Sequence, residues 1–574
     1  KWSFFEVYNE VLKGEQIPPH YFYIVFIFFK IFGNTILVAR SISLIAGIFS
    51  VLGIYQLLNE FKLKREALVA ALLLAVNYFH IYYSQEARPY ALLVTFSIYS
   101  FLYFVKAIKD KRNINFIIYS IFTGFMVSFH LFGLLVLFAQ AIIFLLFLSQ
   151  NKNYLQKKII LQLLLSFIII AIIFIPSIEI LIKSQNIKEF WIGENDPFAI
   201  RQIVLDLFAN SEFLISFFIV AIILYVQKLS NFNGKETLNA NNNLLLNLVT
   251  LIWIFIIVLI PIIKSYTSVP MLLNRYFICL LPPLLIVFSI GINQIKNKIL
   301  FRTVILMYII FSIVDLLAIK NYYYKPEKSQ FDKASEYVIS KMKKDETVTS
   351  SLAFYFQYYF DTKQSKTIVQ SNSLDQYINE IKNDSTKIKP FWYIDGFGRE
   401  YKPNEATLAF INNNFYIDYN YDGFQAWAKH FVLTSELLQS LDLSGLNFEK
   451  DYSGDSFMFN LEVFEIVNNK VILSGWAYFD GISSENSKIS IVLINKKTDI
   501  KKTKTIPIQL VVRQDVTSYF KCDFNADNSG FKAEYDISNL DDEDYVIGIY
   551  LENKNYNKKG LFISDKKVLK NNSY

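Results

Sequence analysis

The residues best suited to chemistry are ionisable side chains that interrupt a very apolar stretch of the chain. Up to about residue 320 the sequence is dominated by Ile, Leu, Phe, Val and Tyr. Glu86 and Arg88 lie there in the break 82–90 (Tyr-Tyr-Ser-Gln-Glu-Ala-Arg-Pro-Tyr), between two apolar runs. An ionised side chain costs about 2.5–3.5 kcal/mol at the centre of a bilayer and less at its edge. We therefore expect Glu86 and Arg88 to face a wet cavity or each other. An interfacial turn with a neutralising pair is the alternative.

Arg275 and Tyr276 form a second candidate site at the start of another apolar run. A guanidinium there can hold a phosphate by two parallel hydrogen bonds. Alternatively, Arg275 only anchors the helix by extending its side chain toward the lipid headgroups.

Three further positions could contribute to binding. The turn 16–21 (Gln-Ile-Pro-Pro-His-Tyr) is rigid and precedes an apolar segment, although a proline stop before a helix explains it equally well. Aromatic and acidic residues around Trp191 suit stacking on a sugar or seating at headgroups. His130 and Arg40 are single polar residues at predicted helix ends, and each is a weak signal alone.

The elements that position these residues are membrane-spanning helices, each of which needs about 20 mostly apolar residues. About ten spans are predicted: residues 35–58, 67–83, 90–105, 115–128, 131–148, 159–181, 213–226, 244–263, 275–292 and 300–319. The segment 21–33 is too short for a span and contains Lys30, so we expect an interfacial helix on the outer surface. A short helical hairpin is the alternative.

Basic residues cluster on alternate loops and predict the orientation of the spans. They are Lys62, Lys64 and Arg65, then Lys106, Lys109, Lys111 and Arg112, then Lys152, Lys157 and Lys158, and finally Lys296, Lys298 and Arg302. With these loops in the cytoplasm, the candidate residues and the tail after residue 320 lie on the outer side. The same parity predicts one more span upstream of Lys1, unless the chain begins on the outer side.

Composition excludes several other classes. The net charge of +7 over 574 residues suits loop lysines facing anionic lipid better than a nucleic-acid surface. Two cysteines and four scattered histidines make neither a disulfide framework nor a thiolate or histidine metal cluster. No cofactor is indicated, and a divalent metal is neither demanded nor ruled out by the sequence.

Taken in order, these stretches resemble the GT-C membrane glycosyltransferases, in the superfamily of the protein O-mannosyltransferases and aminoarabinose transferases. The resemblance covers roughly residues 1–320. It rests on Pro18-Pro19-His20-Tyr21-Phe22, Phe32-Gly33, Arg40-Ser41, the stretch from Tyr83 to Tyr90, His130-Leu131-Phe132-Gly133 and Arg275-Tyr276-Phe277.

The resemblance implies a multi-pass enzyme of the inner (plasma) membrane in a bacterial cell envelope. It would move a sugar from a polyprenyl-phosphate donor to a lipid, glycan or protein acceptor outside the cytoplasm. We assign catalytic roles to Glu86 and Arg88. Donor or acceptor binding is assigned to Pro19, His20, Tyr21, Arg40, Tyr90, His130, Trp191, Arg275 and Tyr276. The family's principal base, an acid in the first outer loop, is expected before Lys1, which leaves Glu6, Glu10 and Glu15 as fallback candidates.

After a membrane domain at 1–320, the tail is predicted to form an α/β domain at 321–450 and a β-sandwich at 451–574. In the first we expect a helix at 332–343 and strands at 347–353 and 390–394. In the second we expect strands at 457–466, 471–478, 489–494, 506–512, 531–535 and 545–551. Trp476 could belong to a carbohydrate-binding surface, and a role in the core is the alternative.

Two other functions compete with a glycosyltransferase. An O-antigen ligase or polymerase also has many spans and outer arginines, but usually carries a large outer loop between spans. A lipid or glycan transporter would predict internal repeats or helices broken at the midplane.

Overall fold

The computed structural model divides into two compact units, Lys1–Tyr323 and Tyr324–Tyr574, which we call unit 1 and unit 2. The structure describes most of both. The described residues are 3–151, 154–185, 198–230, 242–268, 270–397, 402–433, 441, 443–448, 450–495, 504–537 and 545–568.

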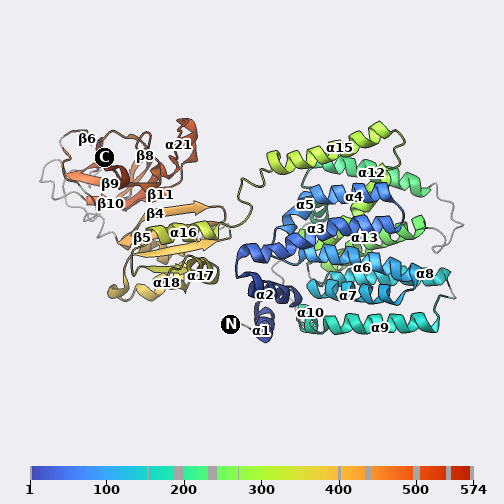
Figure 1. Cartoon of the computed structure of the whole chain (residues 1–574). Helices are drawn as coiled ribbons and strands as arrows, with labels where there is room; N and C mark the ends of the chain where they lie inside the picture. Colours follow the sequence, from blue (N-terminus) through green and yellow to red (C-terminus); the bar gives the residue numbers. More distant parts are fainter. Residues whose placement is uncertain are drawn as a thin grey trace. The chain divides into compact units, whose positions relative to one another are not determined.

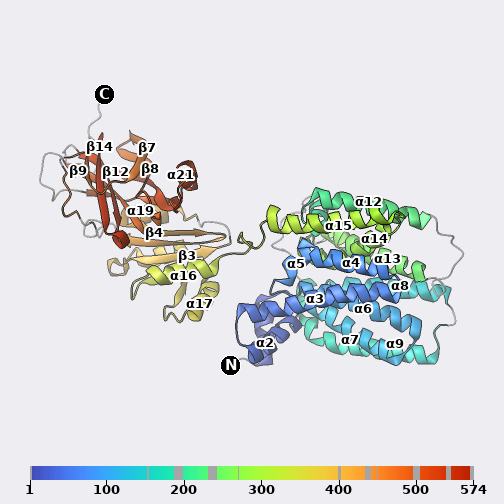
Figure 2. The same cartoon turned by 45° about the horizontal axis from the view of Figure 1, so that its top comes forward.

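Unit 1 is a bundle of long helices that lie side by side with roughly parallel axes (Figures 1 and 2). Eight described helices are long and apolar enough to cross a membrane. They are α3 (Ile36–Glu60), α6 (Tyr90–Asp110), α8 (Gly133–Gln150), α9 with η1 and α10 (Lys157–Gln185), α12 (Glu212–Ser230), α13 (Asn242–Thr267), η2 with α14 (Asn274–Ile292) and α15 with η3 (Lys298–Ile319). The prediction of a polytopic helical bundle is confirmed.

The two other predicted spans, 67–83 and 115–128, correspond to shorter apolar helices. Helices α4 (Lys64–Val76) and α5 (Tyr78–Ser84) form one apolar pair that is bent by 62°. Asn77 stands at the bend, where its side chain caps α5 and donates to the carbonyl of Leu207. Helix α7 (Asn113–Phe129) is apolar but has only 17 residues.

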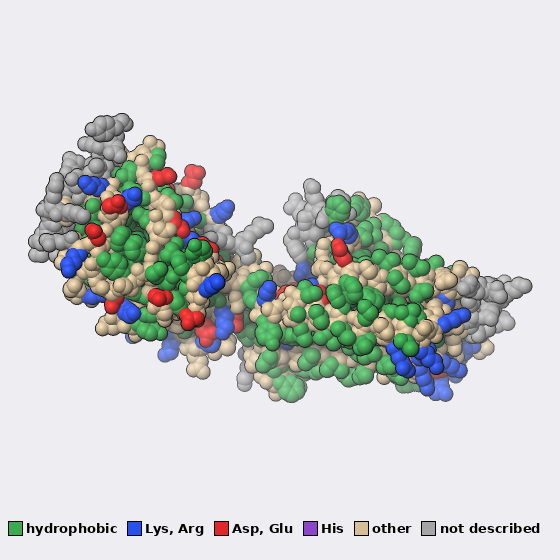
Figure 3. Space-filling model, turned by 90° about the horizontal axis from the view of Figure 1, so that it is seen from above, with side chains coloured by type: hydrophobic (Ala, Val, Ile, Leu, Met, Phe, Trp, Pro, Cys, Tyr) green, Lys and Arg blue, Asp and Glu red, His purple; other side chains and the backbone are tan. Residues whose placement is uncertain are grey.

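Burial separates the centre of the bundle from its rim. In α6 and in η2–α14, 83% of the most apolar window is buried, whereas only 17% is buried in the window from α9. Close packing at the centre depends on small residues: a Cβ at Gly291 of α14 would collide with the Ala221 carbonyl of α12. On the face seen in Figure 3, hydrophobic side chains cover most of unit 1, and Lys and Arg gather at one end.

Two short helices precede the bundle, α1 (Phe4–Gly14) and α2 (His20–Phe32). Ser3 begins α1 with a capping box, and Tyr8 and Lys183 join α1 to α10 (Ile178–Gln185) by hydrogen bonds. The 13 residues of α2 extend about 20 Å, which is too short to cross the hydrocarbon core.

Unit 2 begins with an α/β layer built on a five-stranded sheet in the order β2-β1-β3-β5-β4. Strands β1 (Thr347–Ser350), β2 (Val369–Ser371) and β3 (Phe391–Gly396) are parallel, and β5 (Ala426–Leu433) and β4 (Phe415–Gly423) continue the sheet antiparallel. The helices of this layer are α16 (Phe331–Lys341), α17 (Ala353–Thr362), α18 (Leu374–Ile381) and α19 (Glu405–Asn414). The predicted strand 347–353 was too long: β1 ends at Ser350, whose hydroxyl accepts a hydrogen bond from the backbone of Leu352 and turns the chain toward α17.

The second half of unit 2 contains two antiparallel sheets with a shared apolar core. Their orders are β10-β9-β13-β14-β6 and β11-β12-β8-β7. The strands are β6 (Tyr452–Gly454), β7 (Met458–Val467), β8 (Lys470–Tyr478), β9 (Ser487–Asn495), β10 (Lys504–Ile506), β11 (Gln509–Val511), β12 (Gly530–Asp536), β13 (Tyr545–Asn553) and β14 (Lys558–Val568).

The prediction of a single strand at 506–512 was wrong. Pro507 has no backbone N–H to give to a ladder, and the chain changes sheets there: β10 pairs with β9, whereas β11 pairs with β12. Trp476 on β8 is buried against Tyr478, Val516 and Ala526, so this tryptophan packs in the core.

A buried histidine joins three strands of the α/β layer. His430 on β5 places Nδ1 2.6 Å from Asp418 Oδ1 and Nε2 3.4 Å from Glu346 Oε1, and its ring stacks on Trp392 at 4.6 Å. Burial alone would lower the pKa of His430, but the two carboxylates outweigh it and raise the pKa to about 9. The imidazole is therefore cationic at neutral pH.

We expect unit 2 to lose stability as the pH rises through this range. The folded-state pKa of His430 lies above its ordinary value near 6.5, so its contribution is complete below about pH 6.5 and disappears as the pH passes about 9. The test compares the thermal unfolding midpoints of wild-type protein and His430→Gln between pH 6 and 9.5. The wild-type midpoint should be higher at pH 6, and the difference should shrink steadily as the pH rises. A difference independent of pH would contradict a protonated His430.

Candidate active site

A cavity of about 610 Å³ lies in unit 1 where several helix ends and turns meet. It is bounded by the α1–α2 turn, the α5–α6 turn, the α7–α8 corner, α10, the end of α13 and the segment leading into η2. The polar and charged residues that line it are Glu15, Gln16, Glu86, Arg88, Tyr90, His130, Ser184, Gln185, Lys264, Ser268, Arg275 and Tyr276. Two carboxylates and three cations thus share one hollow at the end of an apolar bundle.

Arg88 is held in the turn between α5 and α6 by backbone contacts. Its amide donates to the carbonyl of Glu86 at 2.8 Å, and its own carbonyl accepts a hydrogen bond from Ser43 of α3 at 3.1 Å. The Nη1 of Arg88 donates to both carboxylate oxygens of Glu15, at 3.0 and 3.2 Å. Glu86 and Arg88 were expected to face either a wet cavity or each other. Both line the cavity, and the acid that pairs with Arg88 is Glu15.

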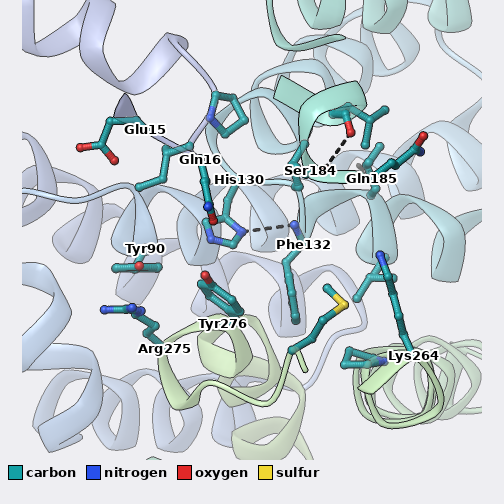
Figure 4. Close-up of a pocket in the computed structure, with 18 of the residues that line it drawn as sticks. Glu15, Gln16, Tyr90, His130, Phe132, Ser184, Gln185, Lys264, Arg275 and Tyr276 are labelled. Atoms are coloured by element: carbon teal, nitrogen blue, oxygen red, sulfur yellow. Dashed lines mark hydrogen bonds between the residues drawn. The ribbon is translucent and has the colours of Figure 1, made fainter. Parts of the chain in front are cut away.

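Aromatic rings form one wall of the cavity. His130 lies between Tyr90 and Tyr276, with ring centres 5.7 and 5.2 Å apart, and Phe132 packs on Tyr276 at 5.2 Å. Figure 4 shows this cluster with Arg275 beside it. The backbone N–H of Phe132 donates to Nδ1 of His130 at 3.2 Å, so this nitrogen carries no proton and the neutral ring keeps its proton on Nε2.

The remaining cations come from the α13–η2 region. Arg275 lies in the first turn of η2 (Asn274–Leu280), with its guanidinium carbon 5.9 Å from the ring centre of Tyr276. Asn274 is hydrogen-bonded to Asp206 of α11 (Ala199–Leu207), which fixes the start of this element. Lys264 projects from the last turn of α13, and in the view of Figure 4 it lies across the cavity from Arg275. An anion inside the cavity would therefore meet positive charge from more than one side.

The structure brings six of the predicted site residues to this cavity, namely Glu86, Arg88, Tyr90, His130, Arg275 and Tyr276. Four others lie elsewhere. Pro19 and His20 begin α2, where His20 contacts Ser177, and Tyr21 is 2% exposed and packs in an apolar cluster with α3 and α6. Arg40 is exposed on α3. Trp191 lies outside the described residues.

Two further charged residues line the cavity: Lys264, which was not predicted, and Glu15, which was named only as a fallback candidate for the base. Lys264 could have been identified from the sequence, because it is a single cation in the last turn of a long apolar helix that contains Pro261. Glu15 directly precedes the turn 16–21, but its partner Arg88 is 73 residues away, and no sequence pattern links the two.

Comparison with known proteins supports the resemblance drawn from the motifs. Residues 16–178 match the family model described as dolichyl-phosphate-mannose-protein mannosyltransferase. This segment contributes Glu86, Arg88, Tyr90 and His130 to the cavity. The similarity to this mannosyltransferase family therefore lies in the first part of the chain. No curated protein matches the chain.

Three solved structures are similar to the chain at low sequence identity. The crystal structure of ArnT from Cupriavidus metallidurans in the apo state has 10% identity and a TM-score of 0.47, over 74% of this chain and 92% of that one. The same enzyme bound to undecaprenyl phosphate has 10% identity and a TM-score of 0.46, over 72% and 88%. The oligosaccharyltransferase of Archaeoglobus fulgidus has 14% identity and a TM-score of 0.40, over 73% and 65%.

Proposed function

We propose that this protein is a membrane glycosyltransferase that moves a sugar from a polyprenyl-phosphate donor to a lipid, glycan or protein acceptor. The observation that carries the proposal is the cavity itself. Arg88, Arg275, Lys264 and Glu86 line one cavity, and part of the lining comes from the segment that matches the mannosyltransferase family model.

The donor would place its phosphate among the cations. In the transfer step the acceptor oxygen forms a bond to the anomeric carbon while the bond from that carbon to the phosphate oxygen breaks. Negative charge then grows on the departing polyprenyl phosphate, and preorganised cations stabilise this charge in the transition state. The aromatic wall of Tyr90, His130 and Tyr276 lines the same cavity and could contact the sugar ring.

The acceptor hydroxyl must lose its proton during the step. Both carboxylate oxygens of Glu15 already accept hydrogen bonds from Arg88. The carboxylate of Glu86 also lines the cavity, and it forms no hydrogen bond or ion pair within the described part of the chain. Of the two carboxylates that line the cavity, Glu86 is therefore the one that we assign to accept a hydrogen bond, and then the proton, from the acceptor.

The reaction would take place on the outer side of the membrane. The cavity lies at the α5–α6 and α7–α8 turns, whereas Lys62, Lys64 and Arg65 lie at the α3–α4 turn and Lys109 to Arg112 at the α6–α7 turn. Successive turns of membrane helices lie on opposite sides, and basic turns favour the cytoplasm. We therefore propose that the cavity faces away from the cytoplasm.

Mass spectrometry of lipids extracted from the purified protein tests the proposal. We expect a polyprenyl monophosphate that carries a sugar, and its mass would identify that sugar. The lipid should be strongly depleted from Arg275→Ala and retained by Arg40→Ala, an exposed arginine outside the cavity. A polyprenyl diphosphate oligosaccharide would instead favour a ligase or polymerase, and the absence of any polyprenyl lipid would contradict the proposed donor.

A further inference from the structure

Unit 2 exposes four aromatic side chains at one edge of its α/β layer. Phe354, Tyr355, Phe397 and Phe424, which we call the aromatic patch, are 86%, 46%, 54% and 41% exposed. Exposed apolar groups of this size are uncommon when they occur together, and they mark surfaces that bind another apolar phase.

The patch is fixed by the fold rather than loosely displayed. Phe331, which is buried, stacks on Tyr355 at 5.7 Å and packs edge-on against Phe397 at 5.3 Å. Tyr355 and Phe397 pack on each other at 5.6 Å, and Phe354 packs on Tyr355 at 5.9 Å. These rings therefore keep their outward positions without closing into the core.

The patch also lies where the chain enters unit 2. The amide of Gln330 donates to the carbonyl of Phe424 at 3.0 Å, and the amide of Phe424 donates back to the side chain of Gln330 at 2.8 Å. Ser329 donates to the side chain of Gln425 at 3.0 Å, and the amide of Phe397 donates to the carbonyl of Gln425 at 2.9 Å. The entry residues are thus joined by hydrogen bonds to the β4–β5 turn and, through it, to the aromatic patch.

The entry residues follow closely on the last candidate membrane span, Lys298–Ile319. Tyr322 is still part of unit 1, because it is buried and its ring packs on Tyr78 at 5.5 Å. Only residues 324–329 separate unit 1 from Gln330, and a chain of this length extends at most about 25 Å. The patch is therefore tethered within reach of the bilayer that surrounds the span.

We propose that the aromatic patch docks on the headgroup region of that bilayer. Three phenylalanines and one tyrosine, with no charged member, present apolar ring surface that the membrane interface can bury, and the tyrosine hydroxyl can remain at the level of the headgroups. Burial of these rings in the interface would hold unit 2 against the membrane surface.

A fluorescent reporter in the patch tests the proposal in the full chain. Phe354→Cys is labelled with an environment-sensitive dye in a Cys522→Ser background, since the other cysteine, Cys279, is fully buried. The protein is reconstituted in phosphatidylethanolamine–phosphatidylglycerol vesicles with or without spin-labelled lipid. The control is the same label at Tyr519→Cys, a position that is 81% exposed in the other half of unit 2.

We expect blue-shifted emission at position 354 that spin-labelled lipid quenches by more than half, and water-like, unquenched emission at position 519. The double substitution Phe397→Ser and Phe424→Ser should return position 354 toward the control, because it removes half of the patch. Water-like emission at position 354 would overturn the proposal. Blue-shifted emission that spin-labelled lipid leaves unquenched would also overturn it, because the patch would then be covered by protein or glycan.

Discussion

Replacing Arg88 with alanine should lower sugar transfer by roughly 10²- to 10³-fold, the usual effect of losing one preorganised group that stabilises developing negative charge. Arg88 lines the cavity, and only its Nη1 is occupied by Glu15 within the described part of the chain, so the other guanidinium N–H groups are available to a phosphate. Arg275→Ala should have an effect of similar size, since Arg275 lies in the same cavity.

The measurement is the consumption of the sugar-loaded polyprenyl phosphate in membranes from cells that produce each variant. Arg40→Ala is the matched control, because it removes an arginine from the same unit at an exposed position outside the cavity. Arg88→Lys should fall between wild type and Arg88→Ala, since lysine keeps the charge but loses the planar fork. Wild-type turnover in both alanine variants, with normal amounts in the membrane, would exclude the proposed donor site.

Most of the membrane unit follows from composition, because a bilayer accepts few kinds of structure. Long runs of apolar residues must form helices there, since backbone groups find no water in the hydrocarbon core. Ten runs were predicted as spans, and helices occupy all of them. The 62° bend between α4 and α5 was not predicted, because it depends on the contact of Asn77 with Leu207, far along the chain.

The soluble strands were harder to predict because local pattern is weaker there. Strand β14 (Lys558–Val568) contains several lysines around a short apolar centre, and it is strand-like because it pairs with β13. The triad of Glu346, Asp418 and His430 has no periodic signal at all. Its members come from three separate segments, and only the register of the sheet brings them together.

The candidate site was partly predictable because a bilayer accepts few charged residues. A charge inside an apolar region has few explanations, so Glu86, Arg88 and Arg275 could be selected from their context alone. Which carboxylate pairs with Arg88 could not be selected, because the contact joins residues 73 positions apart in the chain. In the structure Arg88 pairs with Glu15 and not with Glu86, so substitutions of the two acids should have different effects.

Replacing Glu86 with glutamine should reduce transfer by about 10²- to 10⁴-fold, the range expected when a general base is lost. Glutamine keeps the shape and can still form hydrogen bonds, but it cannot accept the proton of the acceptor hydroxyl. Glu15→Gln should cost much less, since Glu15 serves mainly to hold Arg88. Glu10→Gln is the control for charge alone, because Glu10 is paired with Lys13 on the exposed face of α1.

The order of the three effects decides the assignment. Turnover should fall furthest in Glu86→Gln, less in Glu15→Gln and not at all in Glu10→Gln, with equal binding of the donor lipid by Glu86→Gln and wild type. Equal donor binding matters because it shows that the cations still hold the phosphate and that only the acceptor step has failed. If Glu15→Gln loses more activity than Glu86→Gln, the base is Glu15, and Arg88 then serves to hold that base rather than the leaving phosphate.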